Sequence, residues 1–261
     1  MPDPIYTPAT CAAPAYQLDW SYSLFWRAGP TAFEWLDELR HLSEKDHIRI
    51  LQHEFREPNV SKFLVSTRPA VAPLRIAQRV KGRLQHLIGS PDRSPFRRNY
   101  ALRSIGSTRR DRLEQYLAAQ LNHHRMADAD AAQRLKQYQV HRPEVRLSEP
   151  RRTSHAQYWY NLHVVMVADG RHMEIRDEVL GGLRDMILAV SDAKGHWLSR
   201  AAIVADHLHM TVGCRLEESP EDVVLCYMNN LAYACGMKPV FRYSYYVGTF
   251  SEYDLGVIPR P

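Results

Sequence analysis

A low-identity internal repeat constrains the fold of this chain more than any other feature. At a constant offset of 147 residues, Val65 pairs with Val212, Pro73 with Pro220 and Leu84 with Leu231. Further along the offset becomes 145, relating Phe96-Arg97 to Phe241-Arg242 and Tyr100 to Tyr245, while upstream Tyr22-Ser23-Leu24 resembles Tyr160-Asn161-Leu162. Because the order of strand-like and helix-like segments recurs with these matches, we expect two related half-units.

The predicted elements alternate in both halves. We expect strands at 18–26, 61–67, 99–105, 158–167, 197–204, 207–213 and 243–249. We expect helices at 30–43, 74–88, 109–126 (continuing to about 138 after a break), 173–190 and 220–235. This pattern favours an α+β fold of two ferredoxin-like half-units, in which helices pack on antiparallel sheets. Residues 1–14 read as a proline-rich leader, and the predicted domains are 1–140 and 157–261, joined by a linker at 141–156.

Composition excludes several other classes of protein. The chain has 261 residues, of which 45% are hydrophobic and 24% charged, as expected for a folded soluble protein. It has no run of about 18 uncharged apolar residues, so we expect no transmembrane helix. The N-terminal residues lack the pattern of a secretory signal. The four cysteines have no close paired spacing, which indicates ordinary thiols in a reducing compartment.

The charge is distributed unevenly along the chain. Residues 72–152 carry a net charge of +11, mostly from arginine, whereas the segments on either side are acidic. The planar guanidinium of arginine suits phosphate, so this block indicates a nucleic-acid backbone track. A solvated helical surface is the other interpretation that charge alone allows.

The segment Asp206-His207-Leu208-His209-Met210-Thr211-Val212 alternates with a period of two. On a strand, His207 and His209 share one face, about 7 Å apart, and the apolar residues share the other. Two neutral imidazoles can hold a divalent metal, although an ordinary pair of exposed histidines fits the same letters. His209-Met210-Thr211 also fits half of the motif of 2H phosphoesterases. That interpretation fails because the first half has Lys62-Phe63-Leu64 at the matching place.

A helical pattern in the first half carries the second candidate motif. Leu113, Leu117 and Leu121 recur every four residues and form a burial stripe. Tyr116 and Gln120, also four residues apart, form a second stripe, and His123-His124 follow one turn later. A tyrosine and a glutamine in this pattern also occur as plain surface residues.

Together, these motifs resemble the single-tyrosine HUH transposases of bacterial insertion sequences (the IS-two-hundred/IS-six-oh-five group). The resemblance covers about 90% of the chain, as two copies. The second copy carries His207-Leu208-His209, the 220–235 helix, Phe241-Arg242 and the aromatic run from Tyr245. The first copy carries Phe96-Arg97, Tyr100, Ser104-Ile105-Gly106 and Tyr116-x-x-x-Gln120.

Each copy departs from the family pattern in a complementary way. The first has Val60 and Lys62 where the histidines belong. In the second, aligning Gly106 with Phe250 places Arg260 at the position of Tyr116, between two prolines that would break a helix. The resemblance therefore implies a fused pseudo-dimer with one composite site, in which Tyr116 and Gln120 meet His207 and His209.

The resemblance also implies the chemistry. Tyr116 would attack a phosphate of single-stranded DNA and form a 5′-phosphotyrosine intermediate. Mg²⁺ or Mn²⁺ would bind to His207, His209 and Gln120. DNA contacts would come from the basic block and one aromatic residue: Arg75, Arg79, Lys81, Arg83, Arg93, Arg97, Arg98, Tyr100 and Arg103. The expected partners are hairpin ends of a mobile element and a second copy of the chain. The expected location is the bacterial cytoplasm, with no contact to a membrane.

Three other functions compete with this hypothesis. The chain could be a catalytically inactive, domesticated protein that binds single-stranded or hairpin DNA. It could be a relaxase or replication initiator, but those carry larger additional parts, for which we expect no room. It could be a metal-free interaction scaffold. A covalent protein–DNA adduct formed with Mn²⁺ would separate these alternatives.

Overall fold

Strands and helices alternate through the computed structural model, which describes residues 3–30, 32–56, 58–89, 94–120, 129–171 and 174–252. The first half contains β1 (Ala15–Gln17), β2 (Asp19–Trp26), α1 (Leu36–Glu44), β3 (Ile48–Arg56), β4 (Val60–Thr67), α2 (Pro73–Leu87), β5 (Phe96–Ile105), α3 (Arg110–Ala118) and α5 (Ala129–Lys136). The remainder contains β6 (Val140–His141), β7 (Arg151–Arg152), β8 (Ala156–Trp159), β9 (Asn161–Val167), the 3₁₀ turn η1 (Asp169–Arg171), α6 (Asp177–Lys194), β10 (Trp197–Ile203), β11 (His207–Gly213), α7 (Pro220–Ala234) and β12 (Tyr246–Thr249).

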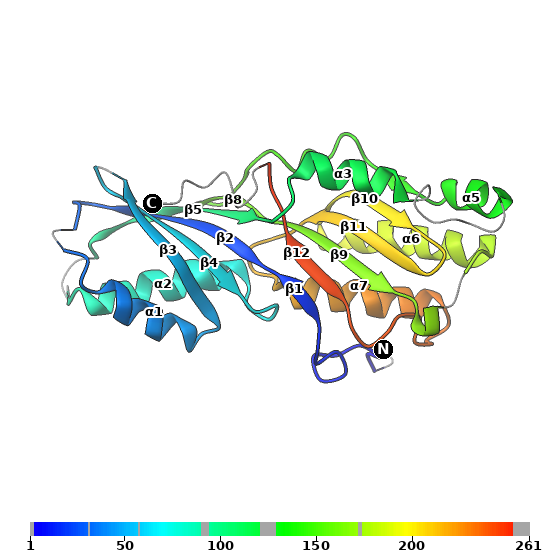
Figure 1. The fold of residues 1–261 in the computed structure, drawn as a ribbon, viewed down its shortest axis with the longest axis horizontal. Helices are drawn as coiled ribbons and strands as arrows, with labels where there is room; N and C mark the ends of the chain where they lie inside the picture. Colours follow the sequence, from blue (N-terminus) through cyan, green and yellow to red (C-terminus); the bar gives the residue numbers. More distant parts are fainter. Residues whose placement is uncertain are drawn as a thin grey trace.

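Two six-stranded sheets lie end to end in an elongated molecule (Figure 1). Sheet B has the order β3-β4-β2-β5-β8-β7, and sheet A has the order β1-β12-β9-β11-β10-β6. The mixed α+β class expected from the sequence is therefore confirmed.

Four neighbouring strands in each sheet have the same order. They run β5-β2-β4-β3 in sheet B and β12-β9-β11-β10 in sheet A, with every neighbouring pair antiparallel. The register is irregular at Leu51 in β3 and at Ser199 in β10, which are matching positions 148 residues apart. The residues that precede these strands also match, because His47 and Gly195 both adopt a left-handed backbone, with φ of 59° and 64°.

The strand register corrects one alignment made from the sequence. Tyr22 lies opposite Phe63, whereas Met210, the partner of Phe63 at offset 147, lies opposite Val164. Tyr22 therefore corresponds to Val164 at an offset of 142, and the match of Tyr22 with Tyr160 is wrong. The offset of 145 holds, because Leu102 and Val247 lie opposite these two residues.

The halves exchange strands at their junction. β1, which leads into β2 of sheet B, pairs in parallel with β12 of sheet A. β8, which leads into β9 of sheet A, pairs in parallel with β5 of sheet B. The segment 141–156, expected to be a linker, thus supplies β7 and the start of β8 to sheet B. Alternating burial of Ala156 and Tyr158 explains why it pairs as a strand.

Other elements differ from the sequence prediction in their bounds. The sequence analysis missed β3, because Gln52, His53 and Glu54 interrupt its apolar alternation. α1 begins at Leu36 instead of residue 30, and α6 spans 177–194 instead of 173–190. The helix expected at 109–126 is seen as α3, and its expected continuation is the separate helix α5. Residues 121–128 lie outside the described part.

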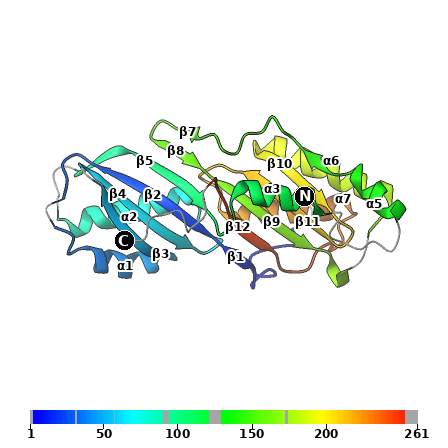
Figure 2. The ribbon, with the colours of Figure 1, turned by 45° about the horizontal axis from the view of Figure 1, so that its top comes forward.

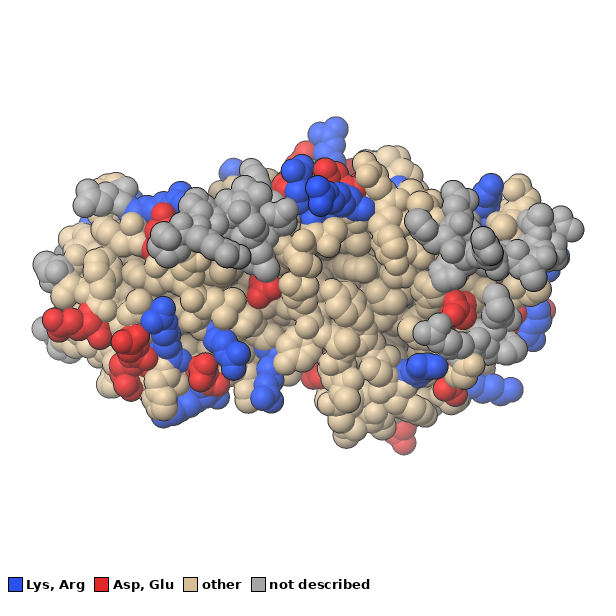
Figure 3. Space-filling view, in the orientation of Figure 1, with Lys and Arg blue, Asp and Glu red and all other residues tan. Residues whose placement is uncertain are grey.

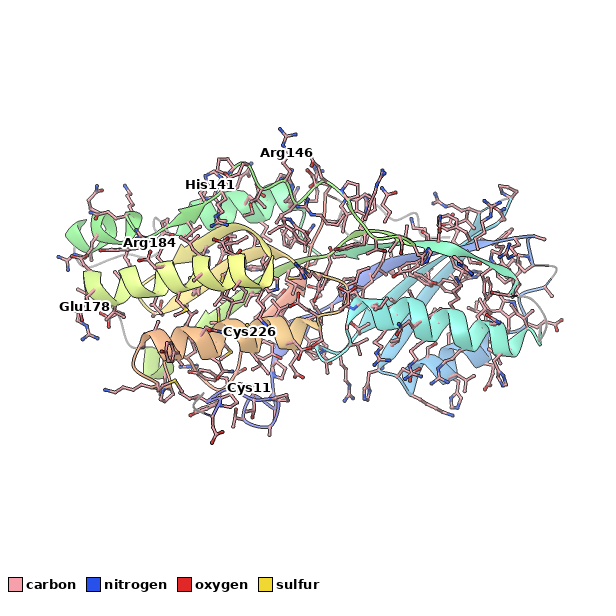
Figure 4. The ribbon with its side chains drawn as sticks, turned by 180° about the vertical axis from the view of Figure 1, so that it is seen from behind. Cys11, His141, Arg146, Glu178, Arg184 and Cys226 are labelled. Carbon is pink, nitrogen blue, oxygen red and sulfur yellow. The ribbon has the colours of Figure 1, made fainter. Side chains whose placement is uncertain are left out.

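Helices cover one face of each sheet. α1 and α2 pack on sheet B, and α6 and α7 pack on sheet A, with α2, α6 and α7 on the same side of the molecule (Figure 4). α2 and α7 each begin with a proline at the first turn, a position that needs no backbone donor. α3 crosses the opposite face of sheet A (Figure 2). None of the described helices combines the length and apolarity needed to cross a bilayer.

Candidate active site at the junction of the two halves

Strand β11 presents its histidines on the face of sheet A that is turned away from α6 and α7. Leu208, Met210 and Val212 point into the core and are at most 4% exposed. His207 and His209 therefore lie on the other face, as the alternation predicted. Their ring centroids are 4.8 Å apart, closer than the 7 Å expected from strand geometry, because the rings incline toward each other.

Both histidines are oriented by a bond at Nδ1. The carboxylate of Asp206 lies 2.6 Å from Nδ1 of His207. His163, on the neighbouring strand β9, places its Nε2 3.0 Å from Nδ1 of His209, and the two rings stack with an angle of 9°. Such bonds fix the tautomer and the direction of a metal-binding histidine. In this arrangement, Nε2 is the ring nitrogen through which each histidine would bind a ligand.

Sequence reasoning missed His163. Burial lowers the pKa of His163 to about 4, so the ring is neutral near pH 7. Its position in the alternating strand β9 gave a signal, because Leu162 and Val164 flank it as core residues. Finding it also required the pairing of β9 with β11, which no sequence feature of the second half alone shows.

Helix α3 brings Tyr116 from the first half to this face. The ring centroids of Tyr116 and His209 are 5.7 Å apart, in an edge-on arrangement, and the tyrosine is 46% exposed. Leu113 and Leu117 anchor the helix against Ala202 of β10, the register partner of His209. The structure thus brings together the phenol and the imidazole pair that the sequence assigned to opposite halves.

A glycine permits the chain to cross between the halves. Gly106 follows β5 and leads toward α3. A Cβ at this position would lie 2.2 Å from the backbone oxygen of Thr249 in β12, so a larger residue would separate the strands. Beyond this crossing, the backbones of Arg109 and Ser251 form an isolated parallel β-bridge, which connects the start of α3 to the chain after β12.

Gln120 is buried two residues beyond the end of α3 at Ala118. It is 1% exposed, and within the described residues its side-chain nitrogen has no hydrogen-bond partner. An unsatisfied buried amide costs about 1–3 kcal/mol, so the environment of this side chain needs a physical explanation. His123, His124 and Arg260, also considered in the sequence analysis, lie outside the described residues.

A pocket of about 570 Å³ opens beside Tyr116 and His209. Arg112, one turn before Tyr116, and Ser107 line its α3 side. Tyr246 of β12 lines the other side, 5.7 Å from His163 between ring centroids. Burial raises the pKa of Tyr246, and the nearby Asp19 raises it further. The surface over β9 and β12 carries few charged side chains (Figure 3).

The basic block is divided between two sides of the molecule. α2 carries Arg75, Arg79, Lys81 and Arg83, on the side away from the histidine face (Figure 4). Both Arg79 and Arg83 pair with Asp46, at 3.8 and 2.6 Å. Lys81 donates to the carbonyl of Arg97, 2.6 Å away. The helix that carries these four residues thus lies on the side of the sheet opposite the pocket, and their contact with DNA stays a prediction.

Four other predicted DNA contacts lie on β5. Arg97 and Arg98 are exposed. Tyr100 is partly buried against Tyr22, with ring centroids 6.1 Å apart, instead of presenting a free stacking surface. Arg103 lies over the ring of Trp159, 3.8 Å from its centroid. Arg93 lies outside the described residues.

No group of three or more histidine, cysteine, aspartate or glutamate side chains in the described ranges is arranged to hold a metal ion.

Comparison with protein-family models and with curated proteins finds no match to this chain. Among solved structures, the chain is similar to a "putative transposase" from Deinococcus radiodurans R1. The two are 21% identical, the match covers 33% of this chain and 75% of that one, and the TM-score is 0.31. The function of this chain is therefore inferred from the geometry of its own site.

Proposed function

We propose that this protein is a single-stranded DNA transposase that cuts and rejoins DNA at one composite site, with Tyr116 as the nucleophile. The 5.7 Å between the ring centroids of Tyr116 and His209 carries the proposal, because α3 and β11 belong to different halves. A nucleophile beside an oriented imidazole pair, at the edge of an open pocket, is the arrangement that covalent catalysis requires.

The two halves would be fused copies of one ferredoxin-like unit, forming a pseudo-dimer within a single chain. The shared strand order, the matching register shifts at Leu51 and Ser199, and the reciprocal exchange of β1 and β8 support this origin. Reciprocal contacts of this kind are typical of a two-fold symmetric dimer. Fusion explains why one tyrosine helix and one histidine strand suffice.

The proposed reaction is transesterification at a DNA phosphate. Tyr116 Oη bonds to the phosphorus while the bond from phosphorus to the 3′ oxygen breaks. The phenol loses its proton, and the departing oxygen gains one to become a 3′ hydroxyl. Tyr116 is then joined to the 5′ phosphate, and attack by another 3′ hydroxyl reverses the exchange with a new partner strand. Each step breaks one ester and forms another, so no nucleotide cofactor is consumed.

His207, His209 and the side-chain oxygen of Gln120 would hold a divalent ion, Mg²⁺ or Mn²⁺. The hydrogen bonds that Asp206 and His163 make with Nδ1 direct Nε2 of the two histidines for this role. Gln120 is proposed as the third ligand on the resemblance to the transposase family. When bound, the ion would stabilise negative charge on the phosphate oxygens.

The experiment is a label-transfer assay. The protein is incubated with Mn²⁺ and a single-stranded oligonucleotide that carries the hairpin end of a candidate element, and is then denatured and run on a gel. A 3′ label should move with the protein, whereas a 5′ label should be released on a shorter fragment. Tyr116→Phe should abolish the adduct and leave DNA binding nearly intact. Tyr233→Phe, on the exposed surface of α7, is the matched control and should form the adduct normally.

An adduct that persists in Tyr116→Phe would contradict the assignment, and Tyr253 would be the next residue to test. Binding without any adduct, with either metal, would favour the alternative of an inactive protein that binds single-stranded or hairpin DNA.

A further inference from the structure

The face of sheet B that corresponds to the histidine face of sheet A carries positive charge. By the strand register, Lys62 occupies the position of His209, Val60 that of His207 and Ser21 that of His163. Arg103 occupies the position of Gly248, because it lies opposite Ser21 as Gly248 lies opposite His163. Sheet B thus presents a lysine where sheet A presents the imidazole of His209, and an arginine where sheet A has a glycine.

Lys62 lies within a group of like charges. On the neighbouring strands its register partners are Glu54 and Ser23. Burial lowers the pKa of Lys62 below its ordinary value, the charges of Arg56 and Arg103 lower it further, and Glu54 acts in the opposite direction. Glu54 is itself paired with Arg56, at 2.9 Å. The half-buried lysine therefore lies among cations with an incomplete counter-charge.

Arg103 is held in a fixed orientation. Its guanidinium lies 3.8 Å from the centroid of the Trp159 ring, on the strand paired with β5. The indole nitrogen of Trp159 donates to the carbonyl of Ser148, 2.8 Å away. The contact with Trp159 restricts the position of this guanidinium, and a guanidinium can bind two phosphate oxygens at once.

The same contacts connect this face with the composite site. Leu147, next to Ser148, packs with Leu113 and Leu117 at the base of the tyrosine helix. The outer faces of both sheets are on the same side of the molecule, because α2, α6 and α7 cover the other (Figures 1 and 4). Both faces are therefore reached from the same side of the molecule.

We propose that Lys62 and Arg103 form a phosphate-binding site on sheet B that holds the single-stranded DNA substrate while Tyr116 acts on it. The proposal rests on the proposed function, because it takes single-stranded DNA as the substrate. The position that binds a metal in one half would thus bind the phosphate backbone in the other.

The test measures binding separately from cleavage. Binding of a fluorescent single-stranded oligonucleotide is followed by anisotropy at several salt concentrations, with EDTA present to prevent cleavage. Lys62→Gln and Arg103→Gln should each weaken binding by about 3–10-fold and reduce the salt slope by about 0.7 for each lost phosphate contact. Lys62→Arg should restore most of the affinity. Arg184→Gln, on α6 at the opposite side (Figure 4), removes the same charge and should leave binding and slope unchanged.

The two proposals fail in different ways. If Lys62→Gln and Arg103→Gln keep the wild-type affinity and slope while the wild type forms its adduct, the phosphate site is wrong and the transposase assignment stands. If both substitutions weaken binding but the wild type never forms an adduct, the phosphate site is supported and the catalytic assignment fails. The thermal unfolding midpoint of each variant is also measured. A midpoint equal to that of the wild type excludes misfolding as the cause of weaker DNA binding.

Discussion

The two halves share a framework and differ in the side chains on one face. Each has the same order of four neighbouring strands. Each also has a register shift in one matched strand, β3 or β10, and a residue with a left-handed backbone just before that strand. On the outer face, sheet A presents His163, His207 and His209, whereas sheet B presents Ser21, Val60 and Lys62. The core positions keep the fold, and the outer positions can change without disturbing it. Under the proposed function, the chemistry therefore depends on a few side chains that the framework does not require.

The largest expected difference is between the effects of substituting matched positions on the outer faces of the two sheets. His207→Ala is expected to slow adduct formation by about 1,000-fold, equivalent to about 4 kcal/mol. The substitution removes a proposed ligand of the divalent ion that would stabilise negative charge on the phosphate oxygens. Val60→Ala, 147 residues earlier, should leave the rate within about twofold. Quenched-flow measurement of the adduct at saturating DNA checks both. Equal loss in the two variants would mean that the faces do not differ in function.

Core substitutions should act alike in the two halves. Leu84 and Leu231 are both 0% exposed, late in α2 and α7. Replacing either by alanine should cost about 3 kcal/mol and lower the unfolding midpoint by roughly 6–12 °C. Because β1 and β8 join each half to the other's sheet, a single calorimetric transition should move in both variants. A second transition that only one variant moves would show that the halves unfold independently.

The bond from His163 to His209 should make a smaller contribution. His163→Ala is expected to reduce the rate by about 10–100-fold and to raise the Mn²⁺ concentration needed for half-maximal rate, since a bond that orients a ligand tunes metal affinity. His163→Gln, whose amide can still bond to Nδ1, should recover part of the loss. Ser21→Ala at the matching position of sheet B is the control. An unchanged Mn²⁺ requirement in His163→Ala would limit His163 to packing.

Much of the framework could be predicted from the sequence. The offsets of 147 and 145, the proline at the start of α2 and α7, and the alternation around His207 all rest on local patterns that the structure keeps. β3 was not predicted, because about half of its residues are polar and interrupt the apolar alternation. The exchange of β1 and β8 was not predicted either, because strands of three or four residues leave too short a pattern to show their partners.

The candidate site shows the same division. Tyr116, His207 and His209 belong to recognisable motifs, and the complementary losses in the two halves suggested that they meet. His163 belongs to no motif, and its role depends on a strand pairing. The location of the basic residues of α2 could not be predicted, because the net charge of a segment does not show which side of the sheet that segment covers. Asp46, far outside the basic block, neutralises part of that charge through Arg79 and Arg83.

The smallest expected effect concerns an ion pair that only the first half has. Asp46 and Arg83 lie 2.6 Å apart, and their matching positions hold Lys194 and Asn230. The hydrogen bond from Arg83 holds the pKa of Asp46 below its ordinary value. The pair therefore stabilises the fold above the unfolded pKa of about 3.9, and this contribution disappears as the pH falls through the lower folded pKa.

Asp46→Asn should lower the free energy of unfolding by about 1 kcal/mol at pH 7, since the pair is only partly buried. The difference from the wild type should narrow below about pH 4, where the wild-type carboxylate also becomes neutral. Urea denaturation of both proteins at pH 7 and near pH 3 measures it. Lys194→Gln should show no such narrowing. A difference that stays constant with pH would assign the effect to packing around Asp46, and the halves would then differ in shape instead of charge at this turn.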